Sequence, residues 1–312
     1  MRLSSLNDLP PAQARTVIVN VHTDLVTTRA VLSAIELAGM PVVLVNCEPT
    51  EASSHHFDKL MANYDFDTLD APLRRHGDTL DWIFSCSRDD QLLLLDSDAE
   101  LRDEGFVHWM RTMLRNQMVF GSGFTEGPLW MTERWLAPPR SILYMERPWV
   151  PCVLMRVEAV RRALAAGRRF AEQIVPNEVW FSRRASNFLA ARFAPPWGTV
   201  SRAFGRLPVD WQRRLSSRSF EPLSRMRREY YGLRPKMVCY DTAALIYEYL
   251  RHEEGLLFAG LDVGLADGQV HHYLGITRSA LFGATPLDAL AEDVEGEVRD
   301  RLSCRYGYTW AS

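Results

Sequence analysis

The chain has 312 residues, 47% of them hydrophobic and 24% charged, with a formal net charge of −3 at pH 7, a composition ordinary for a soluble globular protein. No apolar run approaches the ~20 residues of a membrane-spanning helix, and the N-terminus lacks the apolar core of a secretory signal. The five cysteines form no Cys-x-x-Cys pair, which argues against a zinc site and a disulfide framework. We therefore expect a cytoplasmic protein.

The first hundred residues alternate between apolar runs and helical patterns. A helix is predicted over 27–38, ending at Gly39, a residue typical of helix C-termini. Together with the strands before and after it, this helix forms a βαβ unit, which implies parallel pairing. A further helix is predicted near 80–87. The predicted strands are 16–21, 42–46 and 92–95. This part of the chain therefore resembles a nucleotide-binding α/β half.

Four consecutive leucines, 92–95, lead directly into Asp96, Ser97 and Asp98. Such a run suits a strand that is buried on both faces of a parallel sheet. Side chains at i and i+2 of an extended chain leave from the same face, so both carboxylates are predicted at the strand's carboxyl end. Open α/β sheets bind ligands there, and paired carboxylates suit Mg²⁺ or Mn²⁺. The alternative is a pair of exposed turn acids after a core strand.

Helical and strand-like segments continue to alternate after the Asp-x-Asp pair. They are a helix over 106–115, strands over 118–124 and 148–156, a helix over 157–166, a strand over 237–240, a helix over 241–252, and strands over 256–261 and 270–277. Gly123 lies where the backbone could approach a sugar closely. Trp149 offers a flat ring that suits a sugar face, although burial in the core explains it equally well.

The segment 183–234 differs in composition, with twelve arginines, three acidic residues and interleaved aromatics. A basic, aromatic-rich insertion can make peripheral contact with an anionic membrane surface or hold an anionic substrate. A solvated helical face that covers the core is the simpler alternative. No nucleic-acid partner is expected, because no nucleic-acid-binding motif is present and the whole chain is slightly acidic.

Three motifs, in this order, resemble those of the GT-A glycosyltransferases, especially enzymes akin to glycosyltransferase family 2. The first is Asp-x-Asp after a hydrophobic strand. The second is an acidic residue that opens a leucine-containing helix with a glycine behind it. The third is a strand ending in His, with Gly three residues on and Ser or Thr five residues on. The matching positions are Asp96, Asp98, Asp241, Gly255, His272, Gly275 and Thr277. The resemblance covers residues 16–280.

The resemblance implies an α/β fold of the GT-A type, a Rossmann-like mixed and mainly parallel sheet flanked by helices, here with a basic helical insertion. The whole chain, 1–312, would form one glycosyltransferase domain. Within it, 14–130 would be the nucleotide-sugar-binding half, 131–285 the acceptor-binding half including the insertion 183–234, and 286–312 a C-terminal tail.

The activity implied by the resemblance is transfer of a sugar from a nucleotide sugar to an acceptor hydroxyl, with Mn²⁺ or Mg²⁺ as cofactor. The donor would be a UDP-, GDP- or dTDP-sugar, and the acceptor a sugar, a lipid-linked sugar or a small metabolite. Asp98 would ligate the cation, Asp96 would contact the ribose or a metal-bound water, and His272 would be the third ligand. Asp241 would be the general base, and this role implies inversion at the anomeric carbon. The alternative is that Asp241 is a helix N-cap, although one residue could serve both roles.

Polar residues near the strand ends are candidates for holding the nucleoside, although each could equally be an ordinary loop residue. They are Asn20, Asp24, Asn46 and Glu48, together with Ser97 between the paired acids. Enzymes of the family usually carry an acid at the end of the second strand, where this chain has Asn46.

Two other functions stay open at this point. Haloacid-dehalogenase-like phosphatases use an Asp-x-Asp pair, here Asp96 and Asp98, as nucleophile and acid. Their motif follows the first strand and carries Thr or Val where this chain has Glu100. The second alternative is a non-catalytic protein that binds a nucleotide sugar or carbohydrate without turning it over. A P-loop nucleotidase is disfavoured, because no Gly-Lys-Ser/Thr occurs.

Overall fold

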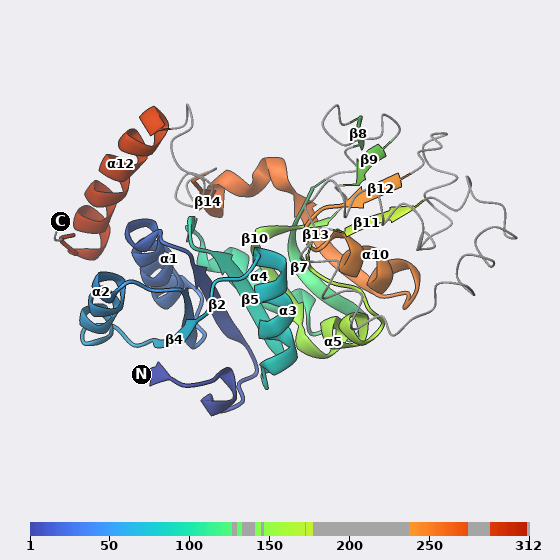
Figure 1. Cartoon of the computed structure of the whole chain (residues 1–312), viewed down its shortest axis with the longest axis horizontal. Helices are drawn as coiled ribbons and strands as arrows, with labels where there is room; N and C mark the ends of the chain where they lie inside the picture. The colour runs from blue at the N-terminus through green and yellow to red at the C-terminus, as the bar shows by residue number, and fades with distance from the viewer. Residues whose placement is uncertain are drawn as a thin grey trace, which may run out of the picture.

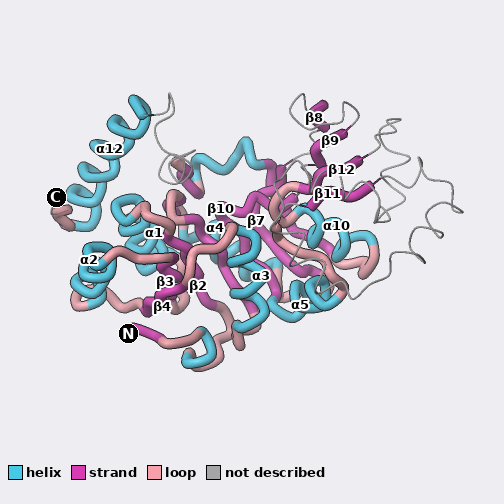
Figure 2. The backbone as a smooth tube through the Cα atoms, viewed as in Figure 1, coloured by secondary structure: helices cyan, strands magenta, loops and turns pink. Residues whose placement is uncertain are grey.

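A mixed sheet, covered by helices on both faces, forms the centre of the computed structural model (Figures 1 and 2). The model describes residues 1–126, 130–132, 141–144, 147–171, 173–176, 237–273 and 288–310. In spatial order the strands of the central sheet are β1 (Arg2–Leu3), β4 (Asp67–Ala71), β3 (Val42–Cys47), β2 (Arg15–Asn20), β5 (Gln91–Asp96), β10 (Arg147–Arg156), β7 (Val119–Glu126) and β13 (Leu257–Asp262).

Most neighbouring strands of this sheet run parallel. The β1–β4, β4–β3, β3–β2, β2–β5 and β7–β13 pairs are parallel, whereas β10 runs antiparallel to both β5 and β7. The predicted α/β architecture with a mixed, mainly parallel sheet is therefore confirmed. Because β10 is antiparallel to β5, the amino end of β10 lies at the same edge of the sheet as the carboxyl end of β5.

Alternate side chains of each buried strand enter opposite hydrophobic cores. Ile18 and Leu93 pack into one core, whereas Val17 and Leu94 pack into the other, as expected for a strand's period of two. The first core is covered by α1 (Asp24–Leu37), α2 (Glu51–Met61), α4 (Glu104–Met113) and α12 (Asp288–Tyr306), and the second by α3 (His76–Cys86), α5 (Val157–Ala165) and α10 (Ala244–His252). Each of the four leucines of β5 is at most 2% exposed, as the sequence predicts.

Two helices begin at other residues than predicted. α3 begins at His76, ahead of the predicted range 80–87, because the apolar pattern leaves out its polar first turn. α10 begins at Ala244 rather than at Asp241, because Ala243 adopts a left-handed conformation (φ +68°) that a helix cannot continue through. The sequence pattern also missed α2, in which Phe57 and Leu60 are the buried apolar residues among mainly polar ones.

Two smaller sheets adjoin the central one. The four-stranded sheet has the order β11 (Gln173–Pro176), β12 (Met237–Tyr240), β9 (Ser141–Tyr144) and β8 (Trp130–Thr132), and the two-stranded sheet pairs β14 (Val270–His272) with β6 (Ala99–Leu101). Short 3₁₀ turns are η1 (Leu6–Asp8) and η3 (Val263–Gly268). The basic segment 183–234, Gly275 and Thr277 lie outside the described residues.

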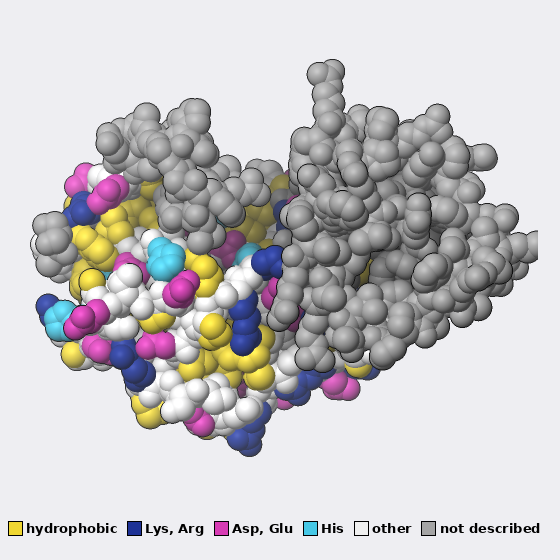
Figure 3. All heavy atoms as spheres, in the orientation of Figure 1, with side chains coloured by type: hydrophobic (Ala, Val, Ile, Leu, Met, Phe, Trp, Pro, Cys, Tyr) yellow, Lys and Arg dark blue, Asp and Glu magenta, His cyan; other side chains and the backbone are white. Residues whose placement is uncertain are grey.

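The C-terminal helix α12 lies beside α1, on the same side of the molecule as the N-terminal strand (Figure 1). On the face drawn in Figure 3, acidic and basic side chains of the described residues are interspersed with hydrophobic ones. Within the described part of the chain, none of the helices combines the length and the apolar character needed to cross a membrane.

Candidate functional site

Two neighbouring acids and a histidine distant in the sequence meet beyond the carboxyl end of β5. Asp96 ends β5, Asp98 lies in the turn to β6, and His272 ends β14. One ligand atom from each of the three residues lies within 4.8 Å of the other two, and the His272 Nε2 atom is 3.2 Å from Oδ1 of Asp98. The structure thus brings together the three residues for which the sequence motifs predict a role in cation binding.

The pairing of β14 with β6 places His272 beside the Asp-x-Asp turn. In this antiparallel pair His272 lies opposite Ala99, the residue that follows Asp98. Successive side chains of a strand point to opposite faces, and His271 accordingly lies with its Nδ1 atom 3.4 Å from Oδ1 of Asp267. As predicted, only one of the two adjacent histidines reaches the cluster.

The donor set fits a divalent cation. Ligand atoms that each lie ~2.0–2.6 Å from one ion can be up to ~5 Å apart, which matches the spacing of the cluster. Carboxylate oxygens suit both Mg²⁺ and Mn²⁺, whereas an imidazole nitrogen suits Mn²⁺ better. Asp96, Asp98 and His272 could therefore hold Mn²⁺ through two carboxylates and one imidazole.

The surroundings of Asp96 favour a bound positive charge. Burial raises the pKa of the Asp96 carboxyl and the adjacent Asp98 carboxylate raises it further, whereas His76, His272 and Arg147 oppose this shift. The Asp96 side chain is still 24% exposed, so a ligand can reach it. A cation at this position would stabilise the ionised carboxylates in place of protons.

His76 and Arg147 are two members of this site that sequence reasoning missed. The His76 Nε2 atom lies 3.6 Å from Oδ1 of Asp96. Helices that follow parallel strands begin at the carboxyl edge of the sheet, and His76 is the first residue of α3, so its place in the chain was an available signal. Arg147 begins β10, and only the antiparallel direction of that strand brings it to this edge.

Arg147 connects the metal cluster to Asp241. Its Nη2 atom lies 3.1 Å from Oδ2 of Asp241, and its Nη1 atom donates a hydrogen bond to the Thr242 carbonyl oxygen at 3.2 Å. The same guanidinium acts electrostatically on Asp96. Asp241 is therefore held at the margin of the cluster by a charge-assisted pair.

Asp241 is not a helix N-cap, so the alternative explanation for this residue is wrong. The N-cap position of α10 is Ala243, and no side chain caps the helix. The Asp241 carboxylate instead accepts a hydrogen bond from the Thr242 N–H at 2.7 Å. The left-handed conformation of Ala243 costs roughly 1–2 kcal/mol and is held by a hydrogen bond from its N–H to the Phe170 carbonyl at 2.9 Å.

Two of the predicted nucleoside-binding residues lie inside a buried polar network. Asn20 and Asn46 are 0% and 2% exposed. The Asn20 side-chain amide donates to Oδ1 of Asp24 at 2.7 Å and to Oδ1 of Asn46 at 2.8 Å. These amides therefore bind the strand ends to α1. Of Asn20, Asn46 and Asp24, only Asp24 is half-buried, and the other two are buried.

Of the two other residues predicted to contact the nucleotide, Ser97 belongs to the buried network and Glu48 lies at the surface. Ser97 is buried, and its hydroxyl accepts a hydrogen bond from the Thr23 hydroxyl at 3.1 Å. Glu48 is exposed and has a positive φ of +49° in the turn after β3. Of these two, only Glu48 presents its side chain to solvent.

Trp149 and Gly123 are explained by packing. The Trp149 ring is 8% exposed and meets the His272 ring edge-on, with centroids 5.4 Å apart. It also packs against Phe124, so it forms a wall behind His272 rather than an open platform for an acceptor. A Cβ atom on Gly123 would lie 2.9 Å from the Cys152 carbonyl oxygen, so the glycine is required by the close approach of β7 and β10.

We predict that the half-buried side chain of His56 makes the protein less stable to unfolding in acid. Its ring packs against Trp310, its Nε2 atom is 2.7 Å from the Thr28 hydroxyl, and burial lowers its pKa below the usual 6.5. The unfolded chain therefore takes up the proton first, so the free energy of unfolding should fall as pH decreases below about 6.5. Urea denaturation at several pH values should show a shallower fall in His56→Gln. The matched control is His55→Gln, at an exposed neighbour, and equal pH profiles for the two variants would contradict the prediction.

Comparison with known proteins finds no family model that matches the sequence and no match among curated proteins. Among solved structures, a mannosyltransferase from Pyrobaculum calidifontis in complex with GDP-Man and Mn²⁺ matches with a TM-score of 0.37 and 11% identity, over 50% of this chain and 49% of that chain. TarS from S. aureus, residues 1–349, matches with a TM-score of 0.35 and 10% identity, over 48% of each chain. A 4-diphosphocytidyl-2C-methyl-D-erythritol synthase from Anaerococcus prevotii matches with a TM-score of 0.35 and 8% identity, over 49% of this chain and 75% of that chain.

These solved structures include a mannosyltransferase. The matched part spans about half the length of the mannosyltransferase chain and of the TarS chain. At these TM-scores, what this chain does has to be argued from its own residues.

Proposed function

We propose that the protein is a metal-dependent glycosyltransferase that moves a sugar from a nucleotide-sugar donor to an acceptor hydroxyl. The observation that carries the proposal is the convergence of Asp96, Asp98 and His272 at the carboxyl end of a strand buried on both faces. Because ligands of open α/β sheets bind at this edge, the cluster occupies the expected place for a cation that accompanies a diphosphate.

The residues of the cluster have distinct roles in this proposal. Asp98 and His272 would hold the cation, with Asp96 as a further ligand or as a contact to the ribose. A divalent cation there would neutralise the negative charge that develops on the departing nucleoside diphosphate. His76, next to Asp96, would orient that carboxylate toward the donor.

Asp241 is proposed as the general base. Its carboxylate would accept the proton of the acceptor hydroxyl, while Arg147 holds the carboxylate in position through the 3.1 Å pair. Attack of the activated hydroxyl on the face opposite the leaving group would invert the anomeric carbon. In this arrangement the half 14–130 holds the donor, and 131–285 supplies the base and the acceptor site.

Two alternatives fit the residues less well. A haloacid-dehalogenase-like phosphatase carries Thr or Val where this chain has Glu100, which is buried here in an ion pair with Arg29. A binding protein without turnover would need no base, whereas Asp241 is held next to the cluster by Arg147.

The test is a thermal-unfolding series with UDP, GDP, dTDP, CDP and ADP, each with and without Mn²⁺. We expect one nucleoside diphosphate to raise the melting temperature only when Mn²⁺ is present. A ligand at a hundredfold excess over its Kd stabilises the folded state by roughly 2.7 kcal/mol, which is readily measured. The responding base then names the donor class for turnover assays. If no nucleotide shifts the melting temperature, either with or without Mn²⁺, the proposed function is wrong.

A further inference from the structure

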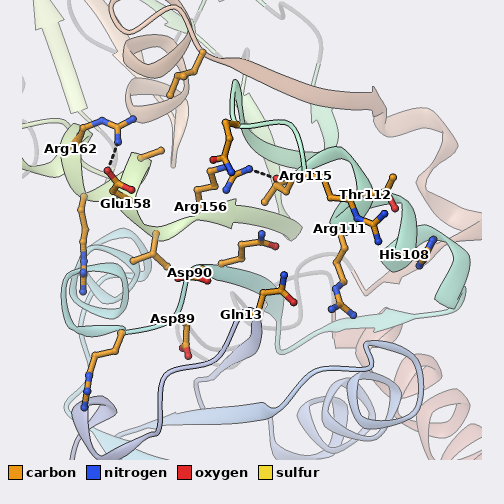
Figure 4. Close-up of a pocket in the computed structure, with 18 residues that line it drawn as sticks. Gln13, Asp89, Asp90, His108, Arg111, Thr112, Arg115, Arg156, Glu158 and Arg162 are labelled. Atoms are coloured by element: carbon orange, nitrogen blue, oxygen red, sulfur yellow. Dashed lines mark hydrogen bonds and ion pairs between the residues drawn. The ribbon is translucent and has the colours of Figure 1, made fainter.

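A large basic pocket lies at the amino end of β5, away from the metal cluster. Its volume is about 930 Å³, and its walls come from α4, α5 and the segment that leads into β5 (Figure 4). Gln91 at the start of β5 lines it, whereas Asp96 at the other end of the strand belongs to the metal cluster. Five residues of extended chain separate the two sites by roughly 17 Å, so one small ligand cannot occupy both. We propose that this pocket binds a small, soluble ligand that carries several phosphate groups.

One wall of the pocket is a basic stripe on α4 and the turn that follows it, where Arg115 lies two residues beyond Met113, the last residue of the helix. His108, Arg111 and Arg115 lie at positions i, i+3 and i+7 of the chain, and Figure 4 shows them on the same side of the cavity. Within the described residues, neither arginine forms an ion pair with a carboxylate. Like charges that line one cavity repel one another, and a bound anion between them would remove that repulsion.

Two other arginines of the lining are held in fixed positions. The Arg156 Nε atom donates to the Val119 carbonyl oxygen at 2.8 Å, and the Arg161 Nε atom donates to the Phe84 carbonyl oxygen at 2.9 Å. Both bonds use neutral acceptors, which hold the two guanidinium groups in place without cancelling their charge. Asp90 and Glu158 act electrostatically on Arg156. Preordered cations of this kind bind an anion with little further loss of side-chain entropy.

The amino end of α5 faces the same cavity. Its first residues, Val157, Glu158 and Ala159, line the pocket, and no side chain caps this nine-residue helix. The Val157 N–H already donates to the Asp90 carbonyl oxygen at 3.0 Å. The next N–H groups of the first turn have no partners within the helix and carry a partial positive charge, which suits an anion. This backbone feature adds to the arginines that line the pocket.

The acids of the pocket do not balance its six arginines. Three acids line it, and two of them are already paired. Asp89 forms a buried ion pair with Arg15 at 2.9 Å, outside the pocket lining, and Glu158 pairs with Arg162. Asp90 is the remaining acid. The pocket therefore carries an excess of positive charge that a single carboxylate ligand would not neutralise.

The shape and chemistry of the pocket favour a small phosphorylated ligand. Guanidinium groups bind phosphate oxygens through paired hydrogen bonds, and the volume falls within the range of ligand pockets, about 300–1,000 Å³. The basic groups line a concavity, which suits a soluble molecule better than a flat lipid surface.

The test uses inorganic tripolyphosphate, titrated into the full chain by calorimetry in EDTA so that the metal site does not contribute. We expect saturable binding that weakens roughly tenfold or more in Arg111→Ala/Arg115→Ala. Asp90→Asn, which removes the remaining acid, should bind more tightly. The matched control Arg2→Ala/Arg299→Ala removes two arginines outside the pocket and should bind as the wild type does. Thermal unfolding of each variant checks that it is folded.

Several results would overturn the proposal. The first is that the wild type does not bind tripolyphosphate, and the second is that Arg2→Ala/Arg299→Ala weakens binding as much as Arg111→Ala/Arg115→Ala does. The third is unchanged binding in Arg111→Ala/Arg115→Ala, which would place the anion elsewhere, including in 183–234. Binding to vesicles that contain phosphatidylglycerol, without binding of tripolyphosphate, would likewise replace the soluble ligand with a membrane. Asp98→Asn should bind tripolyphosphate as the wild type does, so the result of this titration does not depend on the nucleotide series above. Loss of tripolyphosphate binding in this variant would also overturn the proposal of a separate phosphate-binding pocket.

Discussion

Asp98→Asn is expected to abolish sugar transfer and to weaken Mn²⁺ binding by roughly a hundredfold or more. The substitution keeps the volume of the side chain but removes the negative charge beside His272. Loss of a residue that merely supports a ligand already costs about 10–100-fold in metal affinity, and Asp98 is proposed as a ligand itself. Calorimetric titration of Mn²⁺ measures the affinity, and turnover is measured with the donor that the nucleotide series identifies.

Asp241→Asn should separate chemistry from metal binding. We expect Mn²⁺ affinity to stay near that of the wild type while turnover falls by roughly 10²–10⁴-fold, the contribution typical of a general base. Asp267→Asn is the control, because Asp267 is an exposed acid beside His271, and it should alter neither quantity.

Two outcomes would contradict these roles. Undiminished Mn²⁺ binding in Asp98→Asn would remove this carboxylate from the metal site, and undiminished turnover in Asp241→Asn would remove Asp241 as the base. The anomeric configuration of the product, read by NMR, is a separate check. A product that retains the donor's configuration is incompatible with direct attack by a hydroxyl that Asp241 has deprotonated.

Glu100→Ala is expected to lower the free energy of unfolding by roughly 3–5 kcal/mol, the range typical of breaking a buried ion pair. Glu100 and Arg29 are each 1% exposed and pair with each other. Arg301 and Arg305, both on α12, also approach this carboxylate, at 3.3 and 3.7 Å. Arg102 lies 3.6 Å from it as well, so removing the carboxylate leaves Arg29 buried without its counter-charge and places four arginines together. Urea denaturation gives the free energy, and hydrogen exchange should increase in α12.

A double substitution distinguishes the charge from the space that the side chain fills. Arg29→Met/Glu100→Met removes both charges and should be more stable than Glu100→Ala, because apolar replacements of a buried pair are often neutral or stabilising. Glu295→Gln is the exposed control. It breaks a pair with Arg299 at the surface, and we expect a loss of at most about 1 kcal/mol. If Glu100→Ala lowers the free energy of unfolding by no more than this control does, Glu100 does not hold α12 on the core through Arg301 and Arg305.

The central sheet and the main part of the metal cluster could be predicted because their signals are local. Four adjacent leucines can be buried only where both faces of a strand are covered, and β5 is such a strand. The two acids after it follow at the carboxyl end, where the strand direction places them. His272 was predicted from the spacing of a motif, and its position opposite Ala99 confirms that it lies beside the acids.

Other residues could be assigned only from the tertiary structure. Asn20 and Asn46 looked like ligand-binding groups, but pairing of β2 with β3 closes their amides into a buried network. The sequence left Trp149 open as either a platform for a sugar or a core residue, and in the structure its neighbours cover it. A side chain's type does not reveal which groups the rest of the chain will bring against it.

The sequence by itself therefore determined the α/β architecture, the buried strand and the acids that end it, because hydrophobic period and strand direction are properties of short segments. The tertiary structure alone decided that Arg147 meets Asp241, that His76 meets Asp96, and that Glu100 is enclosed by arginines. These contacts join segments 20 to more than 200 residues apart. They depend on which strands pair and in which direction, which no local pattern of residues encodes.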